Sequence, residues 1–197
     1  MKKTLLIASI CALLSCSNDK KNESVITENE TKIETSQTQN ISPSELKKYN
    51  SVKEMLEDAH DFTVEQGTLK FINTDEKNLH IQVSKPTIEG DSDKTISEMV
   101  KRDIVYIAFQ AFAKTSINKI TITSIPIDFN NKKKYYDEYK RTAIVTRDRA
   151  DQIMQKEFGS KDYSILFVSL DEIQTPSDNF SKLKFQDLDL VYSELSK

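Results

Sequence analysis

Residues 104–113 read IVYIAFQAFA, and Gln110 is the one strongly polar side chain among them. Upstream, Ile96 continues an apolar face at helical spacing, and either Ser92 or Asp93 offers a side-chain oxygen that can cap the first turn. A helix that is apolar almost all round is buried on all sides in a folded protein. We therefore predict that this helix is the central element of the hydrophobic core.

Four segments on either side of the helix alternate between apolar and polar residues, as half-buried strands do. Residues 69–71 and 79–83 are separated by the turn-forming residues 73–78 and predict a β-hairpin. Residues 120–125 and 142–146 predict two further strands. Because the strands come in pairs and do not alternate singly with helices, the order favours an α+β fold. We expect a small antiparallel sheet, the hairpin plus two further strands, with helices packed on one face.

Three more segments have helical spacing of apolar residues: 43–60, 150–158 and 188–195. Ser42-Pro43-Ser44-Glu45 has the form of a capping box with proline at the first helical position, which predicts that the first of these helices begins at Pro43. Gly159 is placed to end the second. Residues 165–170 are apolar but too few to assign to a helix or a strand.

The first 16 residues, MKKTLLIASICALLSC, combine two lysines, an apolar run over residues 5–14 and a cysteine. The run has the length of a signal-peptide core, about 7–15 residues, and is too short to cross a bilayer, which needs about 20. With Leu13-Leu14-Ser15-Cys16 at its end, the segment resembles the signal peptides of bacterial lipoproteins. The resemblance implies cleavage before Cys16, a diacylglycerol on its thiol, and often a further acyl chain such as palmitate on the new amine. The alternative is an ordinary secretory signal peptide in which Cys16 is incidental.

The chain therefore divides into three parts: a cleaved lipoprotein signal peptide over residues 1–15, the lipidated cysteine and a disordered tether over 16–42, and a single α+β domain over 43–197. The tether is rich in Asn, Thr, Ser, Glu and Lys, and lacks the apolar surface that folding requires. Two or three acyl chains make a stable membrane anchor. We expect an extracytoplasmic, membrane-anchored protein. In a Gram-negative cell, Ser17 resembles a signal for the outer membrane, with the domain facing the periplasm.

Several classes of site are excluded by composition. The formal net charge is −3, and we expect no binding to nucleic acid, which calls for a basic surface. Three glycines leave no room for the phosphate-binding loops of nucleotide enzymes. Only His60 and His80 are present, in different elements, so we predict no metal site and no cofactor. The resemblance implies that Cys11 is removed with the signal peptide and that Cys16 carries lipid, so we expect neither a disulfide nor a catalytic cysteine in the mature chain.

Carboxylate side chains are abundant, so catalysis by Asp or Glu remains an alternative. Glu89, Asp91 and Asp93 fail the spacing of a calcium loop and fit better as favourable charges at the start of a helix. Pairs such as Asp187/Asp189 and Glu54/Glu57 have the chemistry for acid–base catalysis, although such pairs also arise by chance on solvated faces. We name no catalytic residue.

The segment over residues 128–140, DFNNKKKYYDEYK, is the most unusual in composition. Tyrosine and basic side chains are favoured at binding surfaces. The predicted partner-binding residues are Lys132, Lys133, Lys134, Tyr135, Tyr136 and Tyr139. Their partner is either an acidic protein or anionic lipid head groups. The alternative is a solvated connection between strands, with Tyr135 or Tyr139 packed on the edge of the sheet.

Taken together, these features favour a non-catalytic, protein-binding envelope lipoprotein, either an adaptor with an envelope partner or an immunity-type module that neutralises a toxin. A hydrolase that uses Asp or Glu is the alternative. A solute-binding lipoprotein ranks last because the domain is small for two lobes.

Overall fold

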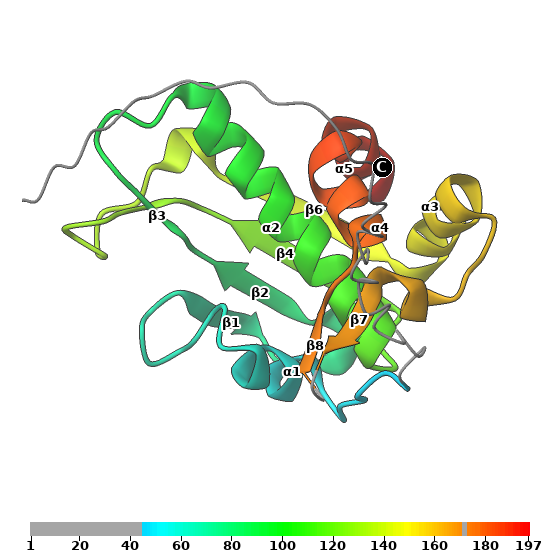
Figure 1. Ribbon diagram of the computed structural model, residues 1–197. Coiled ribbons are helices and arrows are strands. Elements are labelled where there is room, and N and C mark those ends of the chain that lie inside the picture. The colour runs from blue at the N-terminus through cyan, green and yellow to red at the C-terminus, as the bar shows by residue number, and fades with distance from the viewer. Residues whose placement is uncertain (1–44, 171–172) are drawn as a thin grey trace, which may run out of the picture. The chain divides into compact units, whose positions relative to one another are not determined.

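The computed structural model describes residues 45–170 and 173–197 (Figure 1). The strands are β1 (Leu69–Asn73), β2 (His80–Val83), β3 (Pro86–Thr87), β4 (Lys119–Ser124), β5 (Ile127–Asp128), β6 (Arg141–Thr146), β7 (Phe167–Leu170) and β8 (Ile173–Pro176). The α-helices are α1 (Val52–Ala59), α2 (Asp93–Lys114), α3 (Arg147–Phe158), α4 (Asp178–Ser181) and α5 (Leu188–Leu195). The shorter turns are η1 (Glu76–Asn78), η2 (Asp137–Tyr139), η3 (Tyr163–Leu166) and the π-helical η4 (Lys182–Gln186).

A four-stranded sheet with the order β1-β2-β4-β6 forms one layer, and α2 crosses one of its faces (Figure 1). The β1–β2 hairpin is antiparallel, and so is the β4–β6 pair, in which Ile120 lies opposite Val145. The α+β class is therefore confirmed. The central pair differs from the expectation: β2 and β4 are parallel, with Ile81 opposite Ile122. The cause is α2, which crosses over between them and returns the chain to the end of the sheet where β2 begins.

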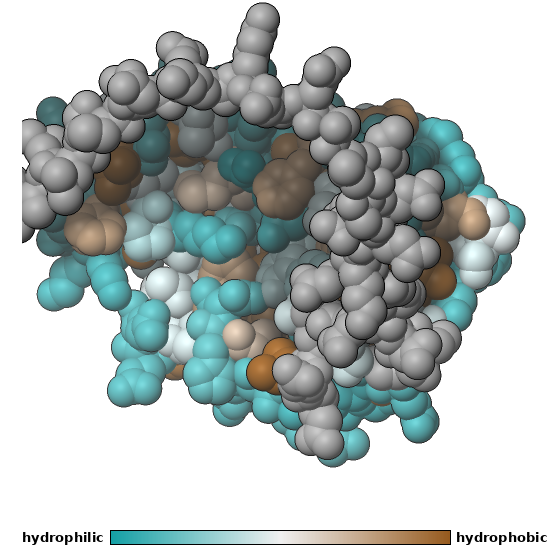
Figure 2. Space-filling model, in the orientation of Figure 1, coloured by the Kyte–Doolittle hydropathy of each residue, from teal (hydrophilic) through white to brown (hydrophobic). Residues whose placement is uncertain are grey.

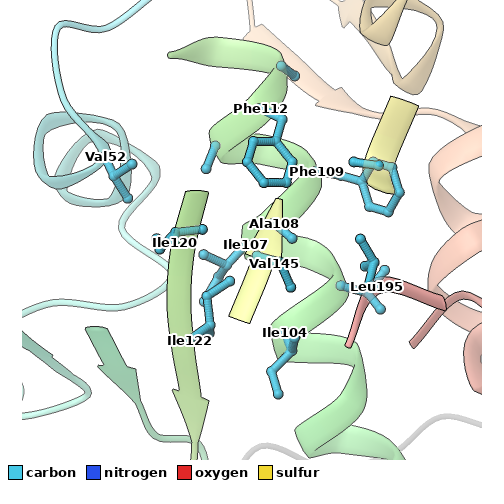
Figure 3. Packing of buried hydrophobic residues seen from close by; sticks show 14 of the residues in the cluster. Val52, Ile104, Ile107, Ala108, Phe109, Phe112, Ile120, Ile122, Val145 and Leu195 are labelled. Atoms are coloured by element: carbon cyan, nitrogen blue, oxygen red, sulfur yellow. The ribbon is translucent and has the colours of Figure 1, made fainter. Parts of the chain in front are cut away.

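The predicted central helix is confirmed by its burial. In Figure 3, Ile107 of α2 points toward Ile120 and Ile122 of β4, while Phe109 points to the opposite side, where Leu195 of α5 lies. All five side chains are fully buried. The sheet covers one side of α2, and α5, η4 and η3 pack on its other sides. Among the described residues the core runs from Leu46 to Leu195, so a chain that begins at residue 17 keeps all of these residues.

An aromatic cluster closes the side of α2 that faces away from the sheet. The ring of Phe180 in α4 lies 5.6 Å from that of Tyr106, 6.4 Å from that of Phe109 and 5.5 Å from that of Phe167. Aromatic pairs at these centroid distances stabilise each other beyond the area they bury. The cluster therefore fastens α4 and the β7–β8 hairpin onto α2.

The predicted helix over residues 43–60 is shorter in the structure, where α1 begins at Val52. The first three residues of the expected capping box lie outside the described residues, and the chain from position 45 to the helix is not helical. A second Ser-x-x-Glu box caps α1 instead. The Ser51 hydroxyl accepts a bond from the Glu54 amide, and the Glu54 carboxylate accepts one from the Asn50 amide, each at 3.1 Å.

Tertiary contacts explain why the helix starts late. The Tyr49 amide donates to the carbonyl of Lys114, at the end of α2, over 2.9 Å. That bond holds Tyr49 at the end of α2, while Leu46 is buried in the core and Gln174 of β8 donates to the carbonyl of Glu45. A helix from Pro43 would direct the same amide into its own turn.

The remaining predicted elements are present. α2 uses Ser92 as its cap, α3 ends at Gly159 in the left-handed conformation with φ 66°, and α5 occupies 188–195. Residues 165–170, left unassigned above, finish η3 and form β7. None of the helices in the described part of the chain combines the length and the apolar composition that crossing a membrane requires.

Candidate functional site

The tyrosine- and lysine-rich segment extends from one end of the sheet. β3 follows β2 and β5 follows β4, so the parallel arrangement continues beyond the four-stranded sheet as a short β3–β5 pair. One residue further on, the Phe129 amide donates to the carbonyl of Thr87 over 3.1 Å, which places Phe129 beside Ile88. The loop over residues 129–135 then turns back, and Tyr135 forms a bridge with Ile127.

Asp128 organises this loop from within. Its Oδ1 accepts bonds from the amides of Asn130 and Asn131 at 2.9 and 3.0 Å. Its Oδ2 accepts the Tyr136 hydroxyl at 2.8 Å and the Lys134 ammonium at 3.2 Å. The Tyr136 and Lys134 bonds hold the pKa of the Asp128 carboxyl below its usual value, and Asp128 in turn raises the pKa of Lys134. Lys134 and Tyr136 are therefore engaged inside the chain.

Tyr139 is engaged as well. Its hydroxyl donates to Oδ1 of Asp93, in the first turn of α2, over 2.6 Å, and this bond raises the pKa of Tyr139. The half-buried Tyr135 lies against the β5 end of the sheet through its bridge to Ile127. By contrast, Lys132 and Lys133 are exposed and take part in no ion pair with any described residue.

Two apolar residues beside these lysines were not identified from the sequence. Ile88 is 60% exposed and Phe129 is 61% exposed, and the β3–β5 pairing makes them neighbours. We call Ile88, Phe129, Lys132 and Lys133 the β-tip. In Figure 2, hydrophobic side chains reach the surface at the end of the molecule where β3 lies, among hydrophilic ones. The available signal was Phe129, an aromatic residue inside a polar turn.

Acidic side chains border the β-tip. Glu89 follows Ile88 directly, and Asp91 accepts a bond from the Ile88 amide at 3.1 Å. Asp137 and Glu138 are exposed on the far side of the loop. The surface around the apolar pair thus carries both signs of charge.

A buried carboxyl group, that of Asp103, lies elsewhere in the fold. Asp103 of α2 is 1% exposed, with the Lys85 ammonium 3.0 Å from Oδ1 and the Ser124 hydroxyl 3.0 Å from Oδ2. Burial raises the pKa of Asp103, while Lys85 and Ser124 act to lower it. Lys85 lies between β2 and β3, and Ser124 is the last residue of β4. Asp103 therefore ties α2 to the sheet and presents no surface to a substrate.

The carboxylate pairs named above are each divided among separate partners. Asp189 pairs with Lys101 at 2.6 Å, whereas Asp187 lies 3.7 Å from Lys182. On α1, Glu54 caps the helix and Glu57 pairs with a lysine of its own helix. Neither pair converges on a common point.

The two histidines lie in different elements and bond to different partners. The His60 ring bonds the carbonyl of Asp58 at 2.7 Å, just after α1. Nε2 of His80 lies 2.9 Å from the Thr123 hydroxyl, which itself lies 2.8 Å from the Thr142 hydroxyl, on the face of the sheet opposite α2. Residues 45–170 and 173–197 contain no group of three side chains placed to share a metal ion.

No family model, curated protein or solved structure matches this chain. The predicted lipidation site, Cys16, lies outside the described residues.

Proposed function

We propose that the chain is a membrane-anchored envelope lipoprotein whose domain binds another envelope protein through the β-tip, as an adaptor or an immunity-type module does. The anchor is supported by the residues before and at Cys16, which combine a basic start, a short apolar run and the cysteine in lipoprotein order. The lipid holds the domain outside the cytoplasm, at the outer membrane if the cell is Gram-negative.

The observation that carries the binding role is the exposure of Ile88 and Phe129 side by side. Large apolar side chains that lie together on a surface favour contact with another surface, and aromatic residues are enriched in protein interfaces. The Asp128 network holds the loop in one shape, so little ordering entropy is lost on binding. Lys132 and Lys133 remain available for an acidic group on the partner.

Between the two partners considered for this segment, the charges favour a protein. An anionic bilayer attracts a uniformly basic surface. Here Glu89 and Asp91 lie directly beside Ile88, and such a bilayer would repel them. A protein surface carries both signs of charge and can match them individually.

Photo-crosslinking in the producing cell tests this proposal. A photoreactive phenylalanine derivative replaces Phe129 in the full-length protein, and the same derivative replaces Ile173, which is 67% exposed on β8. We expect one discrete protein adduct from position 129 and none from position 173. Lys132→Glu with Lys133→Glu should reduce that adduct about tenfold, because it reverses two rim charges.

The matched control is Lys70→Glu with Lys161→Glu, two exposed lysines away from the β-tip, which should leave the adduct unchanged. Lys134 is kept in every variant because it pairs with Asp128. Equal adducts from both positions, adducts to lipid alone, or insensitivity to the β-tip lysines would contradict the proposal.

A further inference from the structure

A second surface feature, separate from the β-tip, is a cavity of about 540 Å³ beside α1. Its walls come from three segments that are far apart in the sequence: the start of α1, the β1–β2 connection with η1, and the connection over residues 115–118 that leads into β4. Cavities that hold small molecules occupy about 300–1,000 Å³. The size therefore suits a small organic molecule.

The floor of the cavity is apolar. Val52 and Leu79 are buried there, and Phe71 and Ile117 are half-buried. These side chains belong to the sheet, to α1 and to the connection before β4, so the floor is the rim of the hydrophobic core. A ligand with an apolar body would bury its surface against them.

The rim is basic. Lys53, Lys77 and Lys119 line the cavity and are exposed, against a single acidic lining residue, Glu76. Among the described residues, Lys77 and Lys119 have no ion-pair partner, and Lys53 lies 3.7 Å from Glu57, at the outer limit of an ion pair. Three lysines thus line a cavity with an apolar floor, in a chain whose overall net charge is −3.

One wall is held in place from behind. The Arg147 guanidinium donates to the carbonyls of Thr115 at 2.9 Å and Ile117 at 2.8 Å, on the side of the connection away from the cavity. These bonds fix residues 115–118 before a ligand arrives. A wall that is already ordered reduces the entropy that binding must lose.

From the cavity, its apolar floor and its three lysines, we infer that this site binds a small amphiphilic anion, a carboxylate or phosphate group on an apolar body. The anionic group meets Lys77 and Lys119 at the rim, and the body lies over Phe71 and Leu79. A neutral apolar molecule would leave the lysines unused, and a cationic one would be repelled by them. The β-tip plays no part in this site.

Decanoate is a suitable probe, and decyltrimethylammonium, which has the same apolar chain and the opposite charge, is its control. Each is titrated into the chain beginning at residue 17, and amide resonances are followed by NMR. We expect decanoate to shift amides of residues 51–53, 77–79 and 115–119. Its dissociation constant should be at least about tenfold lower than that of the cation, as expected for several partly exposed charge contacts.

Two double variants test whether the lysines at the cavity, and not the overall charge of the protein, attract decanoate. Lys77→Glu with Lys119→Glu should weaken decanoate binding about tenfold. Lys70→Glu with Lys161→Glu, which makes the same change of charge elsewhere, should leave it unchanged, and circular dichroism shows that both variants are folded. Shifts centred on Ile88 and Phe129, equal affinity for the two probes, or no shifts at millimolar decanoate would overturn the inference. None of these results affects the crosslinking test of the β-tip.

Discussion

Replacing Arg147 tests how one side chain holds three elements together. Its guanidinium donates to the carbonyls of Phe112 at 2.7 Å, Thr115 at 2.9 Å and Ile117 at 2.8 Å, which lie in the last turn of α2 and the connection that follows. The same group lies over the rings of Phe112 and Tyr163, 5.4 and 6.0 Å from their centroids. It thereby supplies a positive charge to carbonyls that the helix leaves without partners.

The magnitude follows from these bonds. A hydrogen bond to a charged group contributes about 1.5–3 kcal/mol, and bonds that share one group are not additive. We expect Arg147→Ala to lower the free energy of unfolding by about 3–5 kcal/mol. Arg147→Lys keeps the charge near the helix end, which contributes about 0.3–1 kcal/mol, but loses the planar fork. That variant should cost about 2 kcal/mol.

Urea denaturation followed by circular dichroism measures these losses. Arg141→Ala is the matched control, because among the described residues its guanidinium bonds only the nearby carbonyls of Glu138 and Lys140. That change should cost less than about 1 kcal/mol. If Arg147→Ala and Arg141→Ala unfolded at the same urea concentration, the proposed role of Arg147 would be wrong.

Three further changes test other parts of the structure. Ser51→Ala removes the cap of α1 and should cost about 1 kcal/mol in urea denaturation, whereas Ser51→Gly should cost only a few tenths; equal losses would count against the cap. Burial raises the pKa of Tyr106 and of Tyr163 above the ordinary value of 10.0, so the folded state keeps protons that the unfolded state releases. Stability should therefore fall as the pH rises above about 10, and less steeply in Tyr106→Phe with Tyr163→Phe; parallel pH profiles would refute this. Burial lowers the pKa of Lys114, whose ammonium lies 4.6 Å from the centre of the Phe167 ring. Lys114→Met should therefore be at least as stable as the natural chain at pH 7. Any gain in stability should shrink as the pH rises toward 10.5, where the lysine of the unfolded chain also loses its charge. A loss of stability in Lys114→Met at pH 7 would contradict this prediction.

Local patterns predicted most helices and the main strands. The sequence predicts α2 because an almost entirely apolar run as long as residues 104–113 indicates a helix that is buried on all sides. The sequence does not predict the direction of β4 relative to β2, because apolar and polar residues alternate in the same way in parallel and antiparallel strands. Only the path of the helix between them determines it. The start of α1 was missed because two Ser-x-x-Glu boxes precede it, and a tertiary bond from the Tyr49 amide selects the second.

The candidate sites depended even more on tertiary structure. The sequence identified Lys132 and Lys133, but not that Lys134 and Tyr136 are occupied by Asp128. Ile88 looked like an ordinary apolar residue of a loop until the β3–β5 pairing placed it beside Phe129. The cavity beside α1 has no local signal at all, because its lysines lie in three separate segments.

The location of the protein determines which partners and ligands the domain can meet, and we propose that Cys16 determines that location. The most direct test compares Cys16→Ala with Cys11→Ala in the producing cell, by membrane fractionation and labelling with a palmitate analogue. The account predicts that Cys11→Ala is processed, labelled and membrane-bound, because Cys11 lies in the removed signal peptide. Cys16→Ala should lose the label and the processing before residue 16. A labelled Cys16→Ala protein, or a natural chain that is released without lipid, would contradict the lipoprotein assignment.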